Sequence, residues 1–252
     1  MKIVDAFCGV GPWMYRDEIQ PDEPAETLEI MDYCGIEAAL AFNNIGAHAP
    51  GWSVEANARM AEFARAHPRF IPAFILTSRP YDDSRSVEDY LPEMRACGAR
   101  GAWIWPQNNR QGHGMWPWTT APIFEFCASH QVPLFLSIEV TTPERVNDIC
   151  RDFPRLVLVL ASLPYDADNW LFPLLRRHTR LHVCCGPSYI PPLGPSRFVR
   201  HFGSERLLFG SGLPHFGPGG LIGHIMYADI SDADKAQILG GNLERLMGEV
   251  RL

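Results

Sequence analysis

The sequence has no apolar run that approaches the roughly 20 residues of a membrane-spanning helix. It also lacks a dense basic stretch, and its formal net charge is −7. These two absences argue against a membrane and against nucleic acid as partners. The first residues show no basic segment followed by an apolar core, so we expect no secretory signal. The chain is therefore predicted to be cytoplasmic.

The seven cysteines include no C-x-x-C pair with the spacing of a zinc site. Cys184 and Cys185 are neighbours in a predicted strand, where side chains point to opposite faces. Four others come at the end of a helical pattern, just before a predicted strand: Cys34, Cys97, Cys127 and Cys150. This repeated position predicts small buried residues on separate helices, with free thiols in a reducing compartment.

Eight short apolar runs recur along the chain, at residues 2–7, 37–42, 70–76, 101–105, 133–138, 156–161, 181–185 and 206–210. They are too short and too evenly apolar for half-exposed strands, and they suit strands buried on both faces. Helical patterns lie between them. One begins at Pro24 and ends at Gly35, another begins at Ser86 and ends at Gly98, and residues 242–250 are expected to form a closing helix.

Eight strands alternating with helices over about 250 residues indicate an α/β fold of the (β/α)₈ TIM-barrel type. The rival is a doubly wound open sheet, which usually carries a G-x-G-x-x-G loop after its first strand. The segment "FCGVGPW" matches that pattern poorly. No linker is evident, so a single domain over residues 1–252 is predicted.

Chemistry in such barrels takes place at the carboxyl ends of the strands. The candidates there are Asn43, Arg79, Trp105, Ser137, Glu139, Ser162, Tyr189 and His215. Asp5 also lies in the first strand, and a structural role for this carboxylate is the better hypothesis.

Five segments resemble the amidohydrolase-related family, the metal-dependent hydrolases and decarboxylases of the amidohydrolase superfamily. "KIVDAFCG" is similar to the family's first-strand D-x-H-x-H, "ERLLFGSGLPHF" to its G-S-D-x-P-H, and "ILGGNLERLMG" to the N-A-x-R-L-F near its end. "FEFCASHQVPLFLS" and "FPRLVLVLAS" resemble two strands that end in histidine in the family. The resemblance covers nearly the whole chain and implies the same barrel.

The resemblance also implies where metal ligands would stand. The two first-strand histidines fall on Phe7 and Gly9, the next two histidines on Ser137 and Ser162, and the aspartate on Gly212. None of these residue types suits Zn²⁺, which prefers imidazole, thiolate or carboxylate. We therefore predict a site with no metal and no other cofactor.

Glu139 and His215 are then the candidate catalytic residues. Glu139 could be a general base with a raised pKa, or could pair with a loop arginine. His215 matches a family histidine, and a functional and a structural role are both open. Arg79 could bind a substrate carboxylate or pair with Asp82 or Asp83. We expect Asn43, Trp105, Ser137, Ser162 and Tyr189 to contribute to substrate binding.

Two classes of function remain open. One is a metal-independent enzyme that acts on a small organic molecule, with or without a carboxylate, by hydrolysing an ester or lactone. The other is a non-catalytic binding or regulatory subunit that partners an intact paralogue. Trp116 and Trp118 lie beyond the fourth strand in a predicted loop, which suits a subunit interface, so a homodimer is expected.

Overall fold

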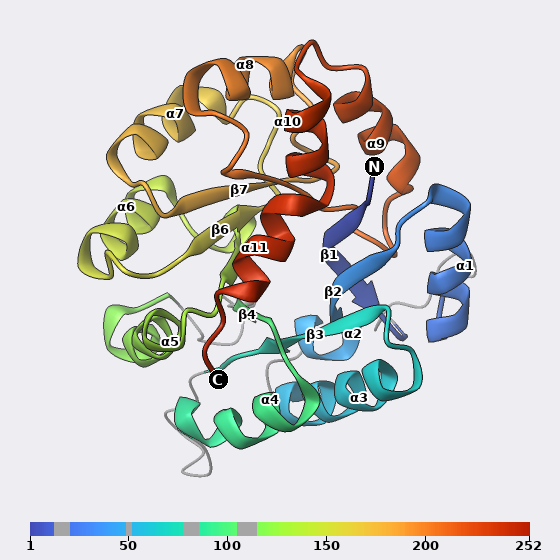
Figure 1. Cartoon of the computed structure of the whole chain (residues 1–252). Helices are drawn as coiled ribbons and strands as arrows, with labels where there is room; N and C mark the ends of the chain where they lie inside the picture. The colour runs from blue at the N-terminus through green and yellow to red at the C-terminus, as the bar shows by residue number, and fades with distance from the viewer. Residues whose placement is uncertain (13–20, 49–51, 78–85, 105–114) are drawn as a thin grey trace.

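Eight parallel strands follow one another in sequence order around a nearly closed barrel, with helices on the outside (Figure 1). The computed structural model describes residues 1–12, 21–48, 52–77, 86–104 and 115–252. The strands are β1 (Val4–Val10), β2 (Ala38–Asn43), β3 (Phe70–Ile75), β4 (Gly101–Ile104), β5 (Leu134–Ser137), β6 (Leu158–Ala161), β7 (Leu181–Cys185) and β8 (Leu207–Phe209). The predicted single-domain (β/α)₈ barrel is confirmed.

The helices lie between these strands. They are α1 (Pro24–Cys34), α2 (Asn44–His48), α3 (Ser53–Ala66), α4 (Leu91–Cys97), α5 (Pro117–His130), α6 (Pro143–Asp152), α7 (Asp168–Arg177), α8 (Gly194–Phe202), α9 (Pro218–Met226), α10 (Asp232–Ala236) and α11 (Asn242–Gly248). Shorter turns are η2 (Val87–Tyr90), η3 (Ile138–Val140) and the π-helical η4 (Gln237–Gly241).

The helix expected from Ser86 to Gly98 is divided in two. Ser86 does cap its start, but the first turn is the 3₁₀ helix η2, and α4 follows from Leu91. The proline at position 92 explains the break, because it has no N–H to continue an α-helical ladder from the first turn. Gly98 ends α4 with φ of 70°, a left-handed conformation in which glycine is favoured.

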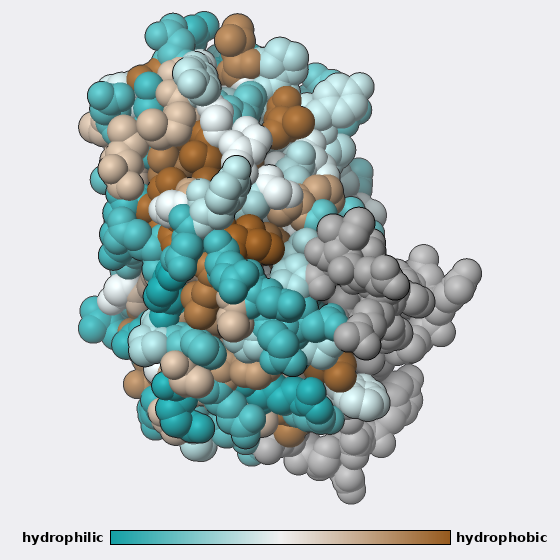
Figure 2. Space-filling view, turned by 90° about the vertical axis from the view of Figure 1, so that its right-hand side faces the viewer, coloured by the Kyte–Doolittle hydropathy of each residue, from teal (hydrophilic) through white to brown (hydrophobic). Residues whose placement is uncertain are grey.

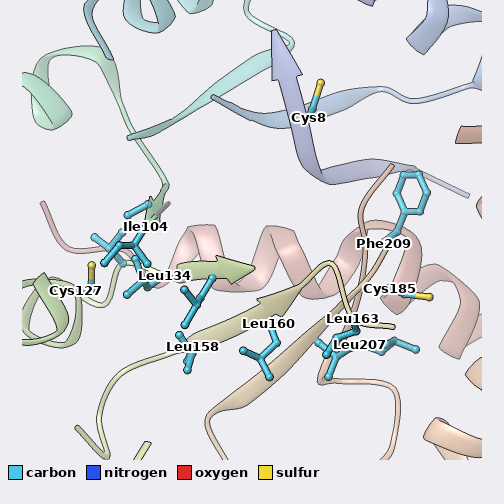
Figure 3. Packing of buried hydrophobic residues seen from close by; sticks show 14 of the residues in the cluster. Cys8, Ile104, Cys127, Leu134, Leu158, Leu160, Leu163, Cys185, Leu207 and Phe209 are labelled. Atoms are coloured by element: carbon cyan, nitrogen blue, oxygen red, sulfur yellow. The ribbon is translucent and has the colours of Figure 1, made fainter. Parts of the chain in front are cut away.

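Side chains of each strand alternate between two apolar clusters. Leu158 and Leu160 belong to the cluster between the strands and the helices, which Figure 3 shows from close by. Val159 and Ala161 belong to the cluster inside the barrel. The strands are therefore buried on both faces, as their even apolar composition predicts.

Helix α11 crosses one opening of the barrel (Figure 1). Leu243 and Leu246 of this helix join the inner cluster, where Val4 of β1 also lies. The buried Asn242 amide fixes the helix in place, since it donates hydrogen bonds to the carbonyls of Ser204 at 2.6 Å and Leu207 at 2.9 Å. The segment "ILGGNLERLMG", which resembles the motif near the family's end, thus covers the barrel interior at the amino-terminal end of the strands.

Exposed aromatic side chains occur on the outer helices. Tyr33 in α1 and Tyr227 after α9 are 92% and 93% exposed. Figure 2 shows the side of the molecule on which α1 and α9 lie, where apolar groups are interspersed among hydrophilic ones. Within the described residues, no helix combines the length and apolar character needed to cross a bilayer.

All seven cysteines are unpaired in the structure. Four are buried, but Cys34, Cys97 and Cys150 are only half-buried, so the expectation of full burial at the ends of helices is wrong for these three. Each lies in the last turn or at the last residue of an outer helix, where one side of the helix faces solvent. Burial raises the pKa of the Cys150 and Cys185 thiols to about 12.

We expect the native protein to react slowly with a thiol reagent at neutral pH, because the reactive thiolate is disfavoured by burial. Denaturation without a reductant should then expose seven titratable thiols. The two counts can be measured in parallel with a chromogenic disulfide reagent. Five or fewer thiols in fresh, denatured protein would indicate a disulfide bond and contradict the unpaired arrangement.

Candidate functional site

Strands β1 and β8 meet at a seam that is closed largely by one carboxylate. Asp5 is fully buried, and its Oδ1 accepts hydrogen bonds from the backbone N–H of Phe7 at 2.9 Å and of Ser211 at 2.8 Å. Its Oδ2 accepts the hydroxyl of Ser211. Backbone bonds from Gly212 to Phe7 and from Gly9 to Leu213 complete the seam, at 2.9 and 2.8 Å. Asp5 therefore has the structural role expected for it, at the join of the barrel.

An aromatic cluster fills the barrel interior below the mouth. The Phe7 ring lies 4.7 Å from that of Trp103 and 6.0 Å from that of Phe42, measured between ring centroids. Phe135 stacks on the other side of Trp103 at 5.1 Å. Trp103 and Phe135 are fully buried, whereas Phe7 is half-buried at the top of the cluster. Trp103 therefore packs inside the barrel.

The second implied ligand position of β1, Gly9, has no room for a side chain, because Asn44 occupies the adjacent space. A Cβ atom added at Gly9 would overlap the side-chain oxygen of Asn44 and lie 3.2 Å from the carbonyl oxygen of Leu213. Asn44 is itself fixed, because its amide donates to the carbonyl of Gly11 at 2.6 Å. A histidine at position 9 would need the buried Asn44 to move.

Gly212 likewise has little room for a side chain, and its backbone conformation disfavours one. Its φ is 72°, a conformation that residues with a side chain rarely adopt. An added Cβ would lie 3.0 Å from both Phe216 and Pro187. An aspartate, the residue implied here by the family resemblance, would be strained and crowded.

These residues do not fit a metal ion. Phe7 places a hydrocarbon ring at one implied ligand position, Gly9 and Gly212 have no side chains, and Ser137 and Ser162 are neutral hydroxyls. Zn²⁺ sites use imidazole, thiolate or carboxylate ligands. Among the residues that the structure describes, no group of three or more His, Cys, Asp or Glu side chains is placed to hold a metal.

Ser137 and Glu139 lie next to each other at the end of β5. The strand ends at Ser137 and the chain turns into η3, so Glu139 does not continue the strand. Instead the Ser137 hydroxyl caps the turn by accepting the N–H of Glu139 at 3.3 Å, and the Glu139 carboxylate is exposed, 3.5 Å from that hydroxyl. Glu139 is therefore accessible to a water molecule or a ligand.

His215 lies in the loop that follows β8, and its backbone N–H donates to the carbonyl of Gly212 at 3.1 Å. The residue is exposed, yet the protein around it lowers the pKa of its imidazole below the ordinary 6.5 by desolvation. The imidazole is therefore neutral at pH 7, the form in which it can accept a proton.

The remaining candidates have different surroundings. Asn43 is buried at the end of β2, where its side-chain oxygen accepts the N–H of Ile45 at 3.2 Å. Its amide nitrogen has no hydrogen-bond partner within the described part of the chain. Ser162 follows β6 with φ of 55° and is half-buried, so its hydroxyl lies close to solvent at the mouth.

Tyr189 points away from solvent and is 2% exposed. Its hydroxyl donates to Asp168 of α7 at 2.7 Å, and Asp168 also pairs with Arg197 at 3.2 Å. These contacts tie the loop after β7 to α7 and α8. Arg79 and Trp105, the other two predicted binding residues, lie outside the described residues, as does most of the loop between β4 and α5.

Sequence reasoning missed the roles of Asn44 and Ser211. Asn44 directly follows Asn43 and Ser211 directly precedes Gly212, both of which were singled out at strand ends, but their partners, Gly11 and Asp5, are 33 and 206 positions away. The one signal in the sequence was that each is a small polar residue just after a buried strand.

The barrel and the arrangement of its mouth define a protein of the (β/α)₈ class. The family model described as amidohydrolase matches residues 12–248, and the chain belongs to this family. The match begins after β1, the strand that carries Phe7 and Gly9.

Solved structures share the fold at low sequence identity. An uncharacterised TIM-barrel protein from Bordetella bronchiseptica is 20% identical with a TM-score of 0.75, covering 99% of both chains. A putative amidohydrolase from Staphylococcus aureus is 15% identical with a TM-score of 0.74, covering 98% of this chain and all of the other. A 2,6-dihydroxybenzoate decarboxylase from Rhizobium is 17% identical with a TM-score of 0.71, covering 98% and 99%. No curated protein matches the chain.

Proposed function

We propose that the mouth of this amidohydrolase-family barrel binds a small organic molecule without a metal ion and hydrolyses an activated ester or lactone. The observation that carries the proposal is the replacement of the implied ligand set: an aromatic ring, a glycine blocked by Asn44 and a glycine in the left-handed conformation stand at three of its positions. The chemistry must then come from acid and base side chains.

His215 is the stronger candidate for the base. It follows β8 at the catalytic end of the barrel, and desolvation keeps its imidazole neutral at pH 7. A neutral imidazole can take a proton from water as the water attacks an ester carbonyl. An ester or lactone suits this reaction because its leaving group is good, whereas an amide would need stronger activation.

Glu139 and the polar groups at the mouth complete the proposed site. The exposed Glu139 carboxylate can act as a second base or hold the attacking water. The hydroxyl of the half-buried Ser162 is a donor for a carbonyl or carboxylate oxygen. Asn43 stays in the proposed binding set, although its amide nitrogen is buried and a ligand would reach it only if the side chain moved. Arg79, Trp105, Ser137 and Tyr189 remain part of the proposed binding set, and the decarboxylase of an aromatic acid among the structural relatives favours a carboxylated ligand.

The second candidate is a non-catalytic binding or regulatory subunit that partners an intact paralogue. The filled interior favours it, because the aromatic cluster occupies space that a metal and its water would need.

A cytoplasmic location and a homodimer are proposed for both candidate functions. Trp116 and Trp118 support the dimer, since they are 40% and 75% exposed with nearly parallel rings 6.0 Å apart. They lie at the N-cap and in the first turn of α5, so the prediction that both are in the loop is wrong. The proline at position 117 accounts for this, because proline favours the first position of a helix.

Kinetics on a panel of esters and lactones, with and without a chelator, test the proposal. We expect chelator-resistant activity that rises with pH through a pKa below 6.5, because the base must be deprotonated. His215→Asn should lower kcat by about 10²–10⁴-fold, and His201→Asn on α8 should leave it unchanged. Loss of activity on chelation would overturn the metal-free site. Saturable ligand binding without turnover of any substrate would favour the subunit instead.

A further inference from the structure

A small pocket lies far from the barrel mouth, where β6 and β7 begin and where α6 and α7 end. Its volume is about 110 Å³. Since a water molecule needs roughly 10–15 Å³ by this measure, the pocket can hold several waters or one compact polyatomic ion. Arg177, His178, Thr179 and Arg180 line one side, and Cys150 with apolar neighbours lines the other.

Arg180 supplies an uncompensated positive charge beside the pocket. Within the described chain, its guanidinium makes no ion pair with a carboxylate. Its Nε is buried out of reach of a water-sized probe, so a ligand in the pocket would meet other atoms of this side chain. A guanidinium without a carboxylate partner favours a ligand that carries oxygen atoms and negative charge.

The neighbouring basic side chains are held in place by one residue. The side-chain oxygen of Asn147 lies 3.0 Å from Nε2 of His178 and accepts Nη1 of Arg177 at 3.4 Å. No carboxylate lines the pocket. The nearest acidic residues on α6, Asp148 and Asp152, are both paired with Arg151, at 2.7 and 2.8 Å. The positive charge of the pocket is thus not neutralised locally.

The charge distribution along the chain singles out the same region. Between Asp168 and Glu205 the sequence has no acidic residue and five arginines: Arg176, Arg177, Arg180, Arg197 and Arg200. The chain as a whole carries −7. Arg197 is paired with Asp168, but the stretch still has an excess of positive charge, which favours the approach of an anion to this part of the chain.

We propose that this pocket binds the phosphate group of a small molecule, either inorganic phosphate or a phosphate monoester. Two guanidinium groups without a carboxylate match the charge of about −1.5 to −2 that a phosphate monoester has at neutral pH. Arg177 and Arg180 supply the positive charge, and the Thr179 hydroxyl completes the contacts. A carboxylate ligand would leave one positive charge uncompensated.

Titration calorimetry with inorganic phosphate tests this site, against sodium chloride at equal ionic strength. We expect saturable binding, a Kd raised at least tenfold by Arg180→Gln, and a Kd within twofold of the original in the matched control Arg200→Gln. Arg177→Gln is a second variant, with the same expected weakening, in case Arg180→Gln does not fold. Binding of methyl phosphate as tight as that of phosphate would identify a monoester as the ligand class, and binding of phosphate alone would identify the free ion.

Three results would overturn the proposal. They are the absence of binding beyond the chloride control, equal affinity in the original protein and both pocket variants, and acetate binding as tightly as phosphate.

Discussion

Replacement of Trp103 by alanine is expected to lower the free energy of unfolding by about 3–5 kcal/mol. The side chain is fully buried and its ring contacts those of Phe7, Phe42 and Phe135, so its removal leaves a cavity at the centre of the barrel. Urea denaturation followed by circular dichroism measures the change. The loss is a large fraction of the roughly 5–15 kcal/mol that stabilises a typical domain.

Trp118→Ala is the matched control for this measurement. Trp118 is 75% exposed, and its removal should change the free energy of unfolding by no more than about 0.5 kcal/mol in the monomer. If Trp103→Ala also lowers stability by less than about 1 kcal/mol, the aromatic cluster is not the packed core described here.

Asp5→Ala should lower the free energy of unfolding by about 2–4 kcal/mol, because buried donors lose their acceptors. The N–H groups of Phe7 and Ser211 and the Ser211 hydroxyl all donate to this carboxylate across the β1–β8 seam. Asp5→Asn keeps the oxygen that accepts both N–H groups and should lower stability by about 1 kcal/mol or less. Equal effects of the two variants would contradict the hydrogen-bonding role.

The difference in stability between the wild type and Asp5→Asn should also depend on pH. Burial raises the pKa of Asp5 above the ordinary 3.8, and its hydrogen bonds offset this only in part. A raised pKa in the folded state adds stability below the unfolded value, and this contribution is lost as pH rises through the folded value. The stability advantage of the wild type over Asp5→Asn should therefore be larger near pH 3.5 than at pH 7. A larger advantage at pH 7 would contradict the raised pKa.

Much of the barrel could be predicted because its strands carry a local signal. The eight apolar runs coincide with the eight strands to within a few residues, since a strand buried on both faces is apolar throughout. Local signals were weaker where the chain changes structure within a few residues. Pro92 divided one expected helix, and the 3₁₀ turn after Ser137 ended the fifth strand one residue before the end of its apolar run.

For the candidate site, the sequence predicted which residues stand at the implied ligand positions but not what surrounds them. Phe7, Gly9 and Gly212 were identified as unsuitable ligands from residue type and from the family resemblance of their segments alone. What fills their surroundings could not be predicted, because it depends on contacts between distant segments: Asn44 beside Gly9, Trp103 beside Phe7, and Phe216 with Pro187 beside Gly212. The irregular pairing of β1 with β2 between Asp5 and Cys8 likewise had no sequence signal.

Elemental analysis of the purified protein shows whether a metal is bound in this amidohydrolase barrel, which has an aromatic cluster and blocked glycines where the family resemblance implies a metal. We expect well under one equivalent of Zn, Mn, Fe or Co per chain after growth with added metals. We also expect a melting temperature that a chelator leaves unchanged, because the interior is held by Phe7, Phe42, Trp103 and Phe135. One tightly bound transition metal per chain, with a melting temperature that falls on chelation, would contradict both expectations.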